Sequence, residues 1–126
     1  MSNNLAYAAY NQNHLGTTSP QKLIEMLYEG ILRFSSLAKK AIENEDTEAK
    51  SQWINKSVNI FVELINQLNY DGGEVAHYLS GLYTHQIKLL SIANMNNSKE
   101  ELETVIKVTK GLLEAWREET KTGAMA

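Results

Sequence analysis

Three histidines are the side chains of this chain best suited to bind a metal ion or to transfer a proton near neutral pH. They are His14, His77 and His85. On one helix, His77 and His85 would lie roughly two turns apart and point about 80° away from each other. Neither has a histidine four residues away, which is the spacing of a helical zinc site. The histidines therefore predict no metal site and are better explained as structural side chains.

The other residues that could do chemistry also have structural explanations. The di-iron signature Glu-x-x-His must occur on two helices, and here it occurs once, at Glu74–His77. Gly72-Gly73 is typical of a turn, since the glycine spacing of the nucleotide-binding motifs is missing, and Ser19 is better explained as a helix cap than as a nucleophile. The chain has no cysteine, which excludes a disulfide framework and a cysteine nucleophile. We therefore predict no enzyme activity and no cofactor.

The first ten residues contain two tyrosines that could act through contact with an apolar surface. Tyr7 and Tyr10 are three residues apart, so one helical turn would place both rings on the same face. With Leu5 and the alanines beside them they would form an apolar arm that docks on the rest of the molecule. A partner that binds the same surface would have to displace this arm. The alternative is a frayed terminus whose tyrosines matter little.

Four segments of the chain have the sequence pattern of a helix, and they form the framework for the residues discussed above. In each of them apolar residues recur every three or four positions, which is the period of a helix that is buried on one side. Ser19 before Pro20 is typical of a helix start, and the pattern from Ser98 to Glu101 is typical of a capping box. We predict an N-terminal arm at residues 1–18, helices at 19–43, 47–70, 74–95 and 98–120, and a loose tail at 121–126.

Short connections between long helices make neighbouring helices antiparallel. No segment shows the sustained alternation of a strand. The predicted fold is therefore all-α, an antiparallel up-down four-helix bundle with a short N-terminal arm or extra helix. At 126 residues and 14.2 kDa we expect one domain, residues 1–126.

Charge and hydropathy narrow the class of partner. The formal net charge is −3 and the pI about 5.6, whereas nucleic-acid-binding domains are usually basic, so we expect no nucleic-acid partner. The sequence shows neither the pattern of a secretory signal peptide nor an apolar run of about 18 residues. We therefore expect a cytoplasmic protein without stable membrane insertion.

The apolar faces of the helices are wider than a bundle needs. A helix on a protein surface needs an apolar stripe a little over about 100° wide, and that of the first helical segment spans roughly 200° at 100° per residue. The third segment has a single charged residue, Lys88, between Val75 and Met95. The surplus apolar surface predicts contact with the arm, with another subunit or with a partner. The alternative is a tilted bundle whose docked arm buries all of it.

Six short blocks of residues follow one another along the chain: Ala6-Tyr7, Ser19-Pro20, Leu23 to Gly30, Leu82-Tyr83, Ala93-Asn94 and Leu112 to Glu118. In this order they resemble the FliS family of flagellar export chaperones. The resemblance covers the chain from about Leu5 to Glu119. Tyr10 and the long spacer before Ser19 depart from the family pattern.

This resemblance implies a cytosolic chaperone that binds the C-terminal helical segment of flagellin. Binding would prevent premature polymerisation, because this segment packs between subunits in the filament. The chaperone would then hand flagellin to the flagellar type III export apparatus, through the export gate protein FlhA. Other flagellar regulators or a co-chaperone are compatible further partners.

The resemblance also implies partner-binding residues. It assigns Tyr7 to the arm, to which the spacing adds Tyr10. For a groove it assigns a set on the first long helix: Leu23, Ile24, Leu27, Tyr28 and Ile31. Leu23, Leu27 and Ile31 could instead be core residues, whereas Ile24 and Tyr28 lie at the edge of the apolar stripe and are the better candidates for an interface. The alternative function is a structural helical-bundle module whose surplus apolar surface closes a homodimer.

Overall fold

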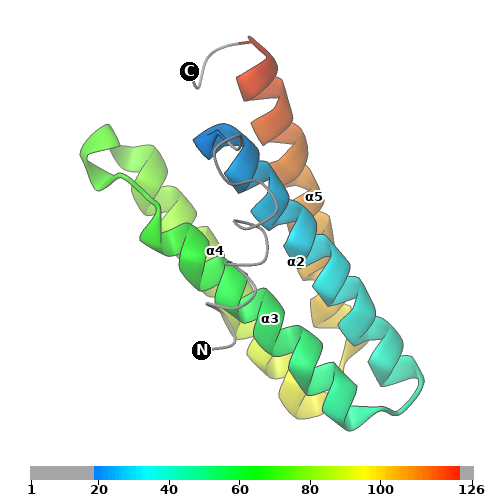
Figure 1. Cartoon of the computed structure of the whole chain (residues 1–126). Helices are drawn as coiled ribbons and strands as arrows, with labels where there is room; N and C mark the ends of the chain where they lie inside the picture. Colours follow the sequence, from blue (N-terminus) through cyan, green and yellow to red (C-terminus); the bar gives the residue numbers. More distant parts are fainter. Residues whose placement is uncertain (1–18, 123–126) are drawn as a thin grey trace.

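The computed structural model of the chain describes residues 19–122 (Figure 1). Over this range the chain forms four α-helices and one short 3-10 helix. They are α2 (Pro20–Glu43), α3 (Thr47–Asn66), η1 (Tyr70–Gly72), α4 (Glu74–Asn96) and α5 (Lys99–Thr122). Consecutive α-helices lie side by side and run in opposite directions. The described residues thus form an all-α four-helix bundle, which confirms the predicted fold class.

Each helix of the bundle packs against two others. α2 contacts α3 and α5, and α4 contacts the same two helices, so α2 and α4 lie on a diagonal. The space between the helices is filled by fully buried side chains: Leu27, Ile31, Ile54, Phe61, Leu64, Leu90, Leu102 and Val105. Each contributes about 1.5–3 kcal/mol on burial, and this core holds the four helices together.

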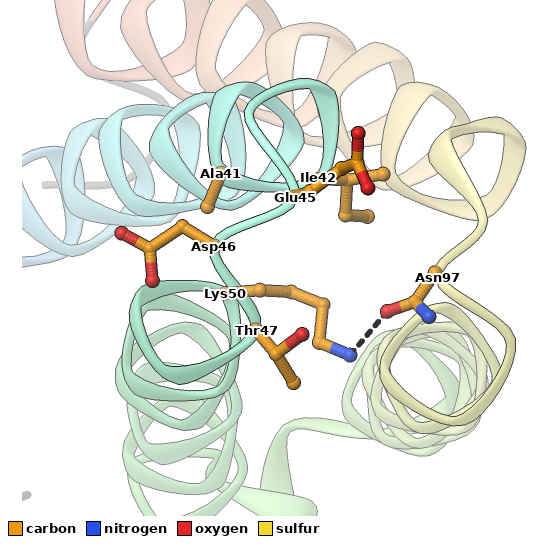
Figure 2. A pocket seen from close by; sticks show the side chains of 7 residues that line it. All are labelled: Ala41, Ile42, Glu45, Asp46, Thr47, Lys50 and Asn97. Carbon is orange, nitrogen blue, oxygen red and sulfur yellow. Dashed lines mark hydrogen bonds between the residues drawn. The ribbon is translucent and has the colours of Figure 1, made fainter.

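One end of the bundle is closed by a buried lysine at the start of α3. Lys50 is 4% exposed, and its Nζ donates hydrogen bonds to the carbonyl of Asn94 (2.8 Å) and to Oδ1 of Asn97 (2.5 Å; Figure 2). A cation is favourable at the C-terminus of a helix, where carbonyl groups lack partners. Lys50 therefore fixes the end of α4 against α3. The small cavity beside it, about 210 Å³, is lined by both loops of this closed end.

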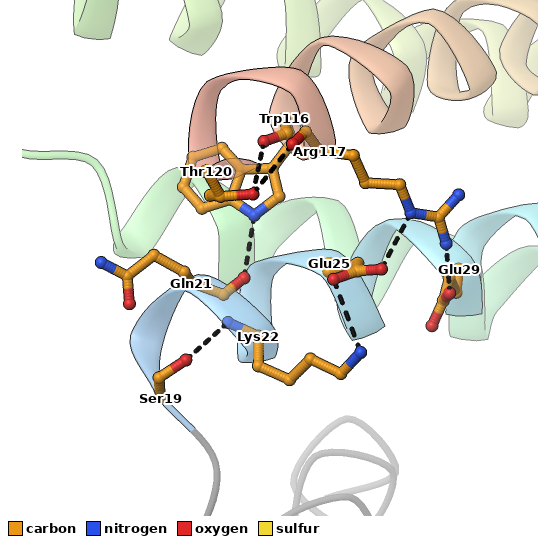
Figure 3. Close-up of polar contacts among 8 residues, drawn as sticks. All are labelled: Ser19, Gln21, Lys22, Glu25, Glu29, Trp116, Arg117 and Thr120. Atoms are coloured by element: carbon orange, nitrogen blue, oxygen red, sulfur yellow. Dashed lines mark hydrogen bonds and ion pairs between the residues drawn. The ribbon is translucent and has the colours of Figure 1, made fainter. Parts of the chain in front are cut away.

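Ion pairs align α2 with α5 along the outside of the bundle. Arg117 donates to Glu25 (2.8 Å) and to Glu29 (2.7 Å; Figure 3). Lys39 with Glu103, and Lys99 with Glu43, continue the series toward the closed end. Exposed ion pairs contribute little to stability, so their effect here is to favour one register between the two antiparallel helices.

The helix boundaries differ from the prediction most at α3 and α5. α3 ends at Asn66 rather than at residue 70, and η1 follows it. The side chain of Asn69 accepts a hydrogen bond from the amide of Asp71 (3.0 Å), and such local bonds compete with the helical ones. α5 continues to Thr122, two residues beyond the predicted end. The arm with Tyr7 and Tyr10, and residues 123–126, lie outside the described residues.

The start of α5 also differs from the predicted capping box. In that motif the carboxylate of Glu101 accepts from the amide of Ser98. Instead, this amide donates to the carbonyl of Ala93 (3.2 Å), and the hydroxyl of Ser98 donates to the Glu101 carboxylate. The cause is Asn97, whose left-handed conformation (φ 50°) ends α4 and turns the following amide back toward it.

Candidate functional site

The end of the bundle opposite Lys50 contains a cleft of about 920 Å³. Toward this open end the α2–α5 pair diverges from the α3–α4 pair (Figure 1). The described residues that line the cleft are Pro20, Gln21, Ile24, Tyr28, Leu64, Gln67, Leu68, Asn69, Val75, Leu79, Tyr83, Leu112, Ala115, Trp116 and Glu119. Among them are one carboxylate and no lysine or arginine. A concave, mostly apolar surface with few polar groups is typical of a binding site.

The rim of the cleft is held by a tryptophan of α5. The indole N–H of Trp116 donates to the backbone carbonyl of Gln21 (2.8 Å; Figure 3). This bond joins the end of α5 to the first turn of α2 and positions the indole ring at the cleft. Across the opening, Val75 of α4 also lines the cleft and is 68% exposed. The rim therefore offers apolar surface to a binding partner.

The floor of the cleft contains two tyrosines from diagonal helices. Tyr28 of α2 and Tyr83 of α4 are 3% and 2% exposed, and their hydroxyl oxygens are 2.5 Å apart. Burial raises the pKa of both side chains above the ordinary tyrosine value. Both phenols therefore remain protonated in the physiological range. The ring of Tyr83 also packs against Phe61, with the ring centroids 5.9 Å apart.

The structure divides the five predicted groove residues of α2 into two groups. Ile24 and Tyr28 line the cleft, whereas Leu27 and Ile31 are buried in the core and Leu23 is half-buried against it. Tyr28, expected at the edge of the apolar stripe, is only 3% exposed, because its hydroxyl has a partner in Tyr83 and the whole side chain can be buried. Its role in partner binding remains a prediction, as do the roles of the other four.

The walls of the cleft that the other helices contribute were not among the predicted groove residues. Leu64, Leu79, Tyr83, Leu112 and Trp116 line the cleft from α3, α4 and α5. For Tyr83, Leu112 and Trp116 the signal was present in the blocks Leu82-Tyr83 and Leu112 to Glu118, which carry part of the family resemblance. The antiparallel arrangement brings these two blocks together, since the start of α4 lies beside the end of α5.

The predicted surplus of apolar surface is visible on α4. Besides Val75, Tyr78 is 69% exposed, and Met95 is also exposed. These side chains are not covered by the helices of the described bundle. The arm that was expected to dock on this surface lies outside the described residues.

The histidine that matched the di-iron signature lies on the surface. His77 is exposed, and its ring contacts that of Tyr70, with the centroids 4.9 Å apart. Between residues 19 and 122 no three acidic or histidine side chains are gathered as a metal site would require. Over the same residues no helix combines the length and the hydropathy needed to cross a membrane.

Comparison with known proteins gives the family. The family described as "Flagellar protein FliS" matches residues 1–123. The flagellar secretion chaperone FliS of Campylobacter jejuni is 64% identical over 94% of this chain and 93% of its own length. The proteins of the same name from Bacillus subtilis and Salmonella typhimurium are 36% and 33% identical, over 89% and 90% of this chain and 84% and 86% of their own lengths. The resemblance found in the sequence is thus confirmed, and the chain belongs to the FliS family.

Proposed function

We propose that this chain is a flagellar secretion chaperone whose cleft holds a helical segment of its client before export. The observation that carries the proposal is the apolar cleft at the open end. Membership of a family whose members are named flagellar secretion chaperones supports it. An amphipathic helix binds such a groove by burying its apolar face.

The proposed client is the C-terminal helical segment of flagellin. While this segment is covered it cannot pack against other flagellin subunits, which prevents premature polymerisation. The chaperone then hands flagellin to the export apparatus through FlhA, and the exchange takes place in the cytoplasm. Other flagellar regulators or a co-chaperone would be further partners.

Holding a client requires affinity and no chemical step. A segment that is disordered before binding loses conformational entropy when it becomes ordered, and a long apolar contact must offset that loss. The cleft and the exposed side chain of Val75 supply apolar surface of this kind. No bond is made or broken, so the proposed function needs no catalytic residue and no cofactor, in keeping with a family of chaperones rather than enzymes.

Isothermal titration with the C-terminal segment of flagellin from the same bacterium tests the proposal. We expect saturable binding with a negative heat-capacity change, which marks burial of apolar surface. Val75→Asp should weaken binding about tenfold or more, because a buried valine contributes about 1.5–3 kcal/mol. Tyr78→Asp is the matched control, since Tyr78 is equally exposed on the same turn of α4 but does not line the cleft.

Two results would contradict the proposal. One is equal loss of affinity in both variants, which would place binding outside the cleft. The other is a stable dimer in sedimentation at micromolar concentration that gains no mass when the flagellin segment is added. That second result would support the alternative function, a homodimeric bundle module.

A further inference from the structure

The tyrosine pair on the floor of the cleft has more hydrogen-bonding capacity than it uses. Each phenol can donate one hydrogen bond and also accept. Between Tyr28 and Tyr83 a single hydrogen bond, 2.5 Å long, joins the two oxygens. Two hydroxyl hydrogens are present, so one remains. No other residue of the described chain is a hydrogen-bond partner of this pair.

The position of the pair determines where an acceptor for that hydrogen can come from. Both side chains line the cleft, while Phe61 packs on the ring of Tyr83 from the core. Leu64 and Leu79 lie beside them as apolar lining residues. The pair therefore brings two hydroxyl groups to a part of the cleft lining that is otherwise apolar.

We propose that the Tyr28–Tyr83 pair is the polar recognition element of the cleft, and that it donates one hydrogen bond to a neutral carbonyl oxygen of the client helix. The proposal rests on the proposed function and specifies what the site recognises. The carbonyl belongs either to an asparagine or glutamine side chain or to the main chain at a helix end.

The surroundings of the pair favour a neutral acceptor over a carboxylate. The described lining residues include Glu119 and no lysine or arginine, so a carboxylate on the client would meet no opposite charge. Burial disfavours negative charge at this place, and it raises the pKa of both tyrosines for the same reason. A neutral carbonyl accepts the hydrogen bond without this disadvantage.

A single polar contact in an apolar cleft would set the register of the bound helix. Apolar contacts tolerate a shift along the groove, whereas a buried hydroxyl left without its acceptor is unfavourable. The pair thus selects the register in which a carbonyl of the client lies above it. Specificity from a few polar groups in an apolar site is a common arrangement.

The decisive variant is the double substitution Tyr28→Phe with Tyr83→Phe. It removes both hydroxyl groups and keeps both rings, and replacing both partners by apolar groups of the same shape is nearly neutral for folding. We expect the variant to melt close to the parent temperature and to bind the flagellin segment about 3- to 10-fold more weakly, the range of one net hydrogen bond. Tyr78→Phe, the same change on the exposed face of α4, should leave the affinity unchanged.

Substituted flagellin segments then identify the acceptor. Each asparagine or glutamine is replaced by leucine in turn, and in a second series each main-chain amide by an ester, which is a weaker acceptor. If the proposal holds, one substitution weakens binding to the parent chaperone but not to the double variant, and the series in which it occurs tells which carbonyl is used. The affinities of the single variants Tyr28→Phe and Tyr83→Phe for the flagellin segment are measured as well, so that the conclusion does not rest on the double variant alone.

Unchanged affinity of the double variant would overturn the proposal, and so would a loss that no segment substitution shares. Failure of the proposed function looks different. In that case the parent protein does not bind the segment, or Val75→Asp binds it as tightly as the parent does.

Discussion

Two buried serines form a short chain of hydrogen bonds between α2 and α3. The hydroxyl of Ser57 donates to the carbonyl of Trp53 in its own helix (3.2 Å). Its hydrogen is therefore used, and the 3.2 Å contact with Ser35 has Ser35 as the donor. Both serines are fully buried. The two residues are thus unequal, because Ser35 depends on Ser57 for an acceptor and Ser57 does not depend on Ser35.

This inequality predicts that Ser57→Ala is more destabilising than Ser35→Ala. Ser57→Ala leaves the buried hydroxyl of Ser35 without its acceptor, which costs about 1–3 kcal/mol. Ser35→Ala leaves Ser57 bonded to Trp53 and should cost less than about 1 kcal/mol. Urea unfolding of the two variants measures the difference. If both variants lose the same unfolding free energy, Ser35 must find another hydrogen-bond acceptor in Ser57→Ala.

Glu25 gives the stability of the protein a dependence on acidic pH. The hydrogen bond from Arg117 is the main cause that lowers the pKa of this carboxyl below its ordinary value of 4.5, with Lys22 adding to it. A carboxyl whose pKa is lower in the folded state stabilises the fold above its unfolded pKa, and this contribution is lost as the pH falls through the folded pKa.

We therefore expect Arg117→Gln to reduce the difference in unfolding free energy between pH 7 and pH 3. Chemical denaturation at a series of pH values from 7 to 3 provides the measurement. The control is Lys110→Gln, a change at an exposed residue of α5 outside the ion pairs described above. An unaltered pH dependence in Arg117→Gln would show that Glu25 is not stabilised by this contact.

At the scale of elements, the turn between α3 and α4 depends on one glycine. Gly73 has φ 103° and ψ −151°, a combination that is essentially restricted to glycine. It directly precedes α4, so its conformation sets the direction in which that helix leaves the turn. Gly72 has no such constraint, and a Cβ at either position would meet open space.

The two glycines form a matched pair for mutation. Gly73→Ala should destabilise the protein by about 1–3 kcal/mol, the cost of a residue held in a rarely populated backbone region. Gly72→Ala should have a much smaller effect, because neither sterics nor a positive φ opposes a side chain there. Thermal melting of both variants tests this prediction. If both melting temperatures fall by a similar amount, the turn adapts to alanine.

The same turn shows how far a periodic pattern predicts an element. The apolar spacing identified four helices in the correct order, because the period of three to four residues reports the face that is buried. It overran the end of α3, since Leu68 continues the apolar pattern although the chain has already left the helix. After Asn66 the chain instead forms a turn in which the side chain of Asn69 accepts a hydrogen bond from the amide of Asp71, and periodicity does not report such a bond.

At the scale of the whole molecule, the bundle has unequal ends. Lys50 and two short loops hold one end together, while the pairs α2–α5 and α3–α4 diverge at the other (Figure 1). The predicted groove residues all lie on α2, whereas the cleft is lined by residues of four helices. Its location follows from this divergence, which depends on the packing of all four helices and is not encoded in the apolar stripe of any one of them.

The unequal ends predict a gradient of local stability along the bundle. Hydrogen-bonded amides at the open end, in the first turns of α2 and α4 and the last turns of α3 and α5, should exchange with deuterium faster than those at the closed end, because fewer packed side chains protect them. Adding the flagellin segment should slow exchange at the open end and leave the closed end unchanged. Uniform slowing along all four helices would argue against binding at the cleft.

Pro20 and Thr122, where the first and last described helices begin and end, both lie at the open end (Figure 1). Trp116 and Gln21 join these two helices there. A peptide fused to α5 through a short flexible linker would thus meet the cleft at an effective concentration on the order of millimolar. Even a segment with a Kd of about 100 µM would be bound in roughly nine molecules out of ten. The fold therefore suits single-chain complexes, in which a peptide that binds only weakly on its own stays bound in the cleft.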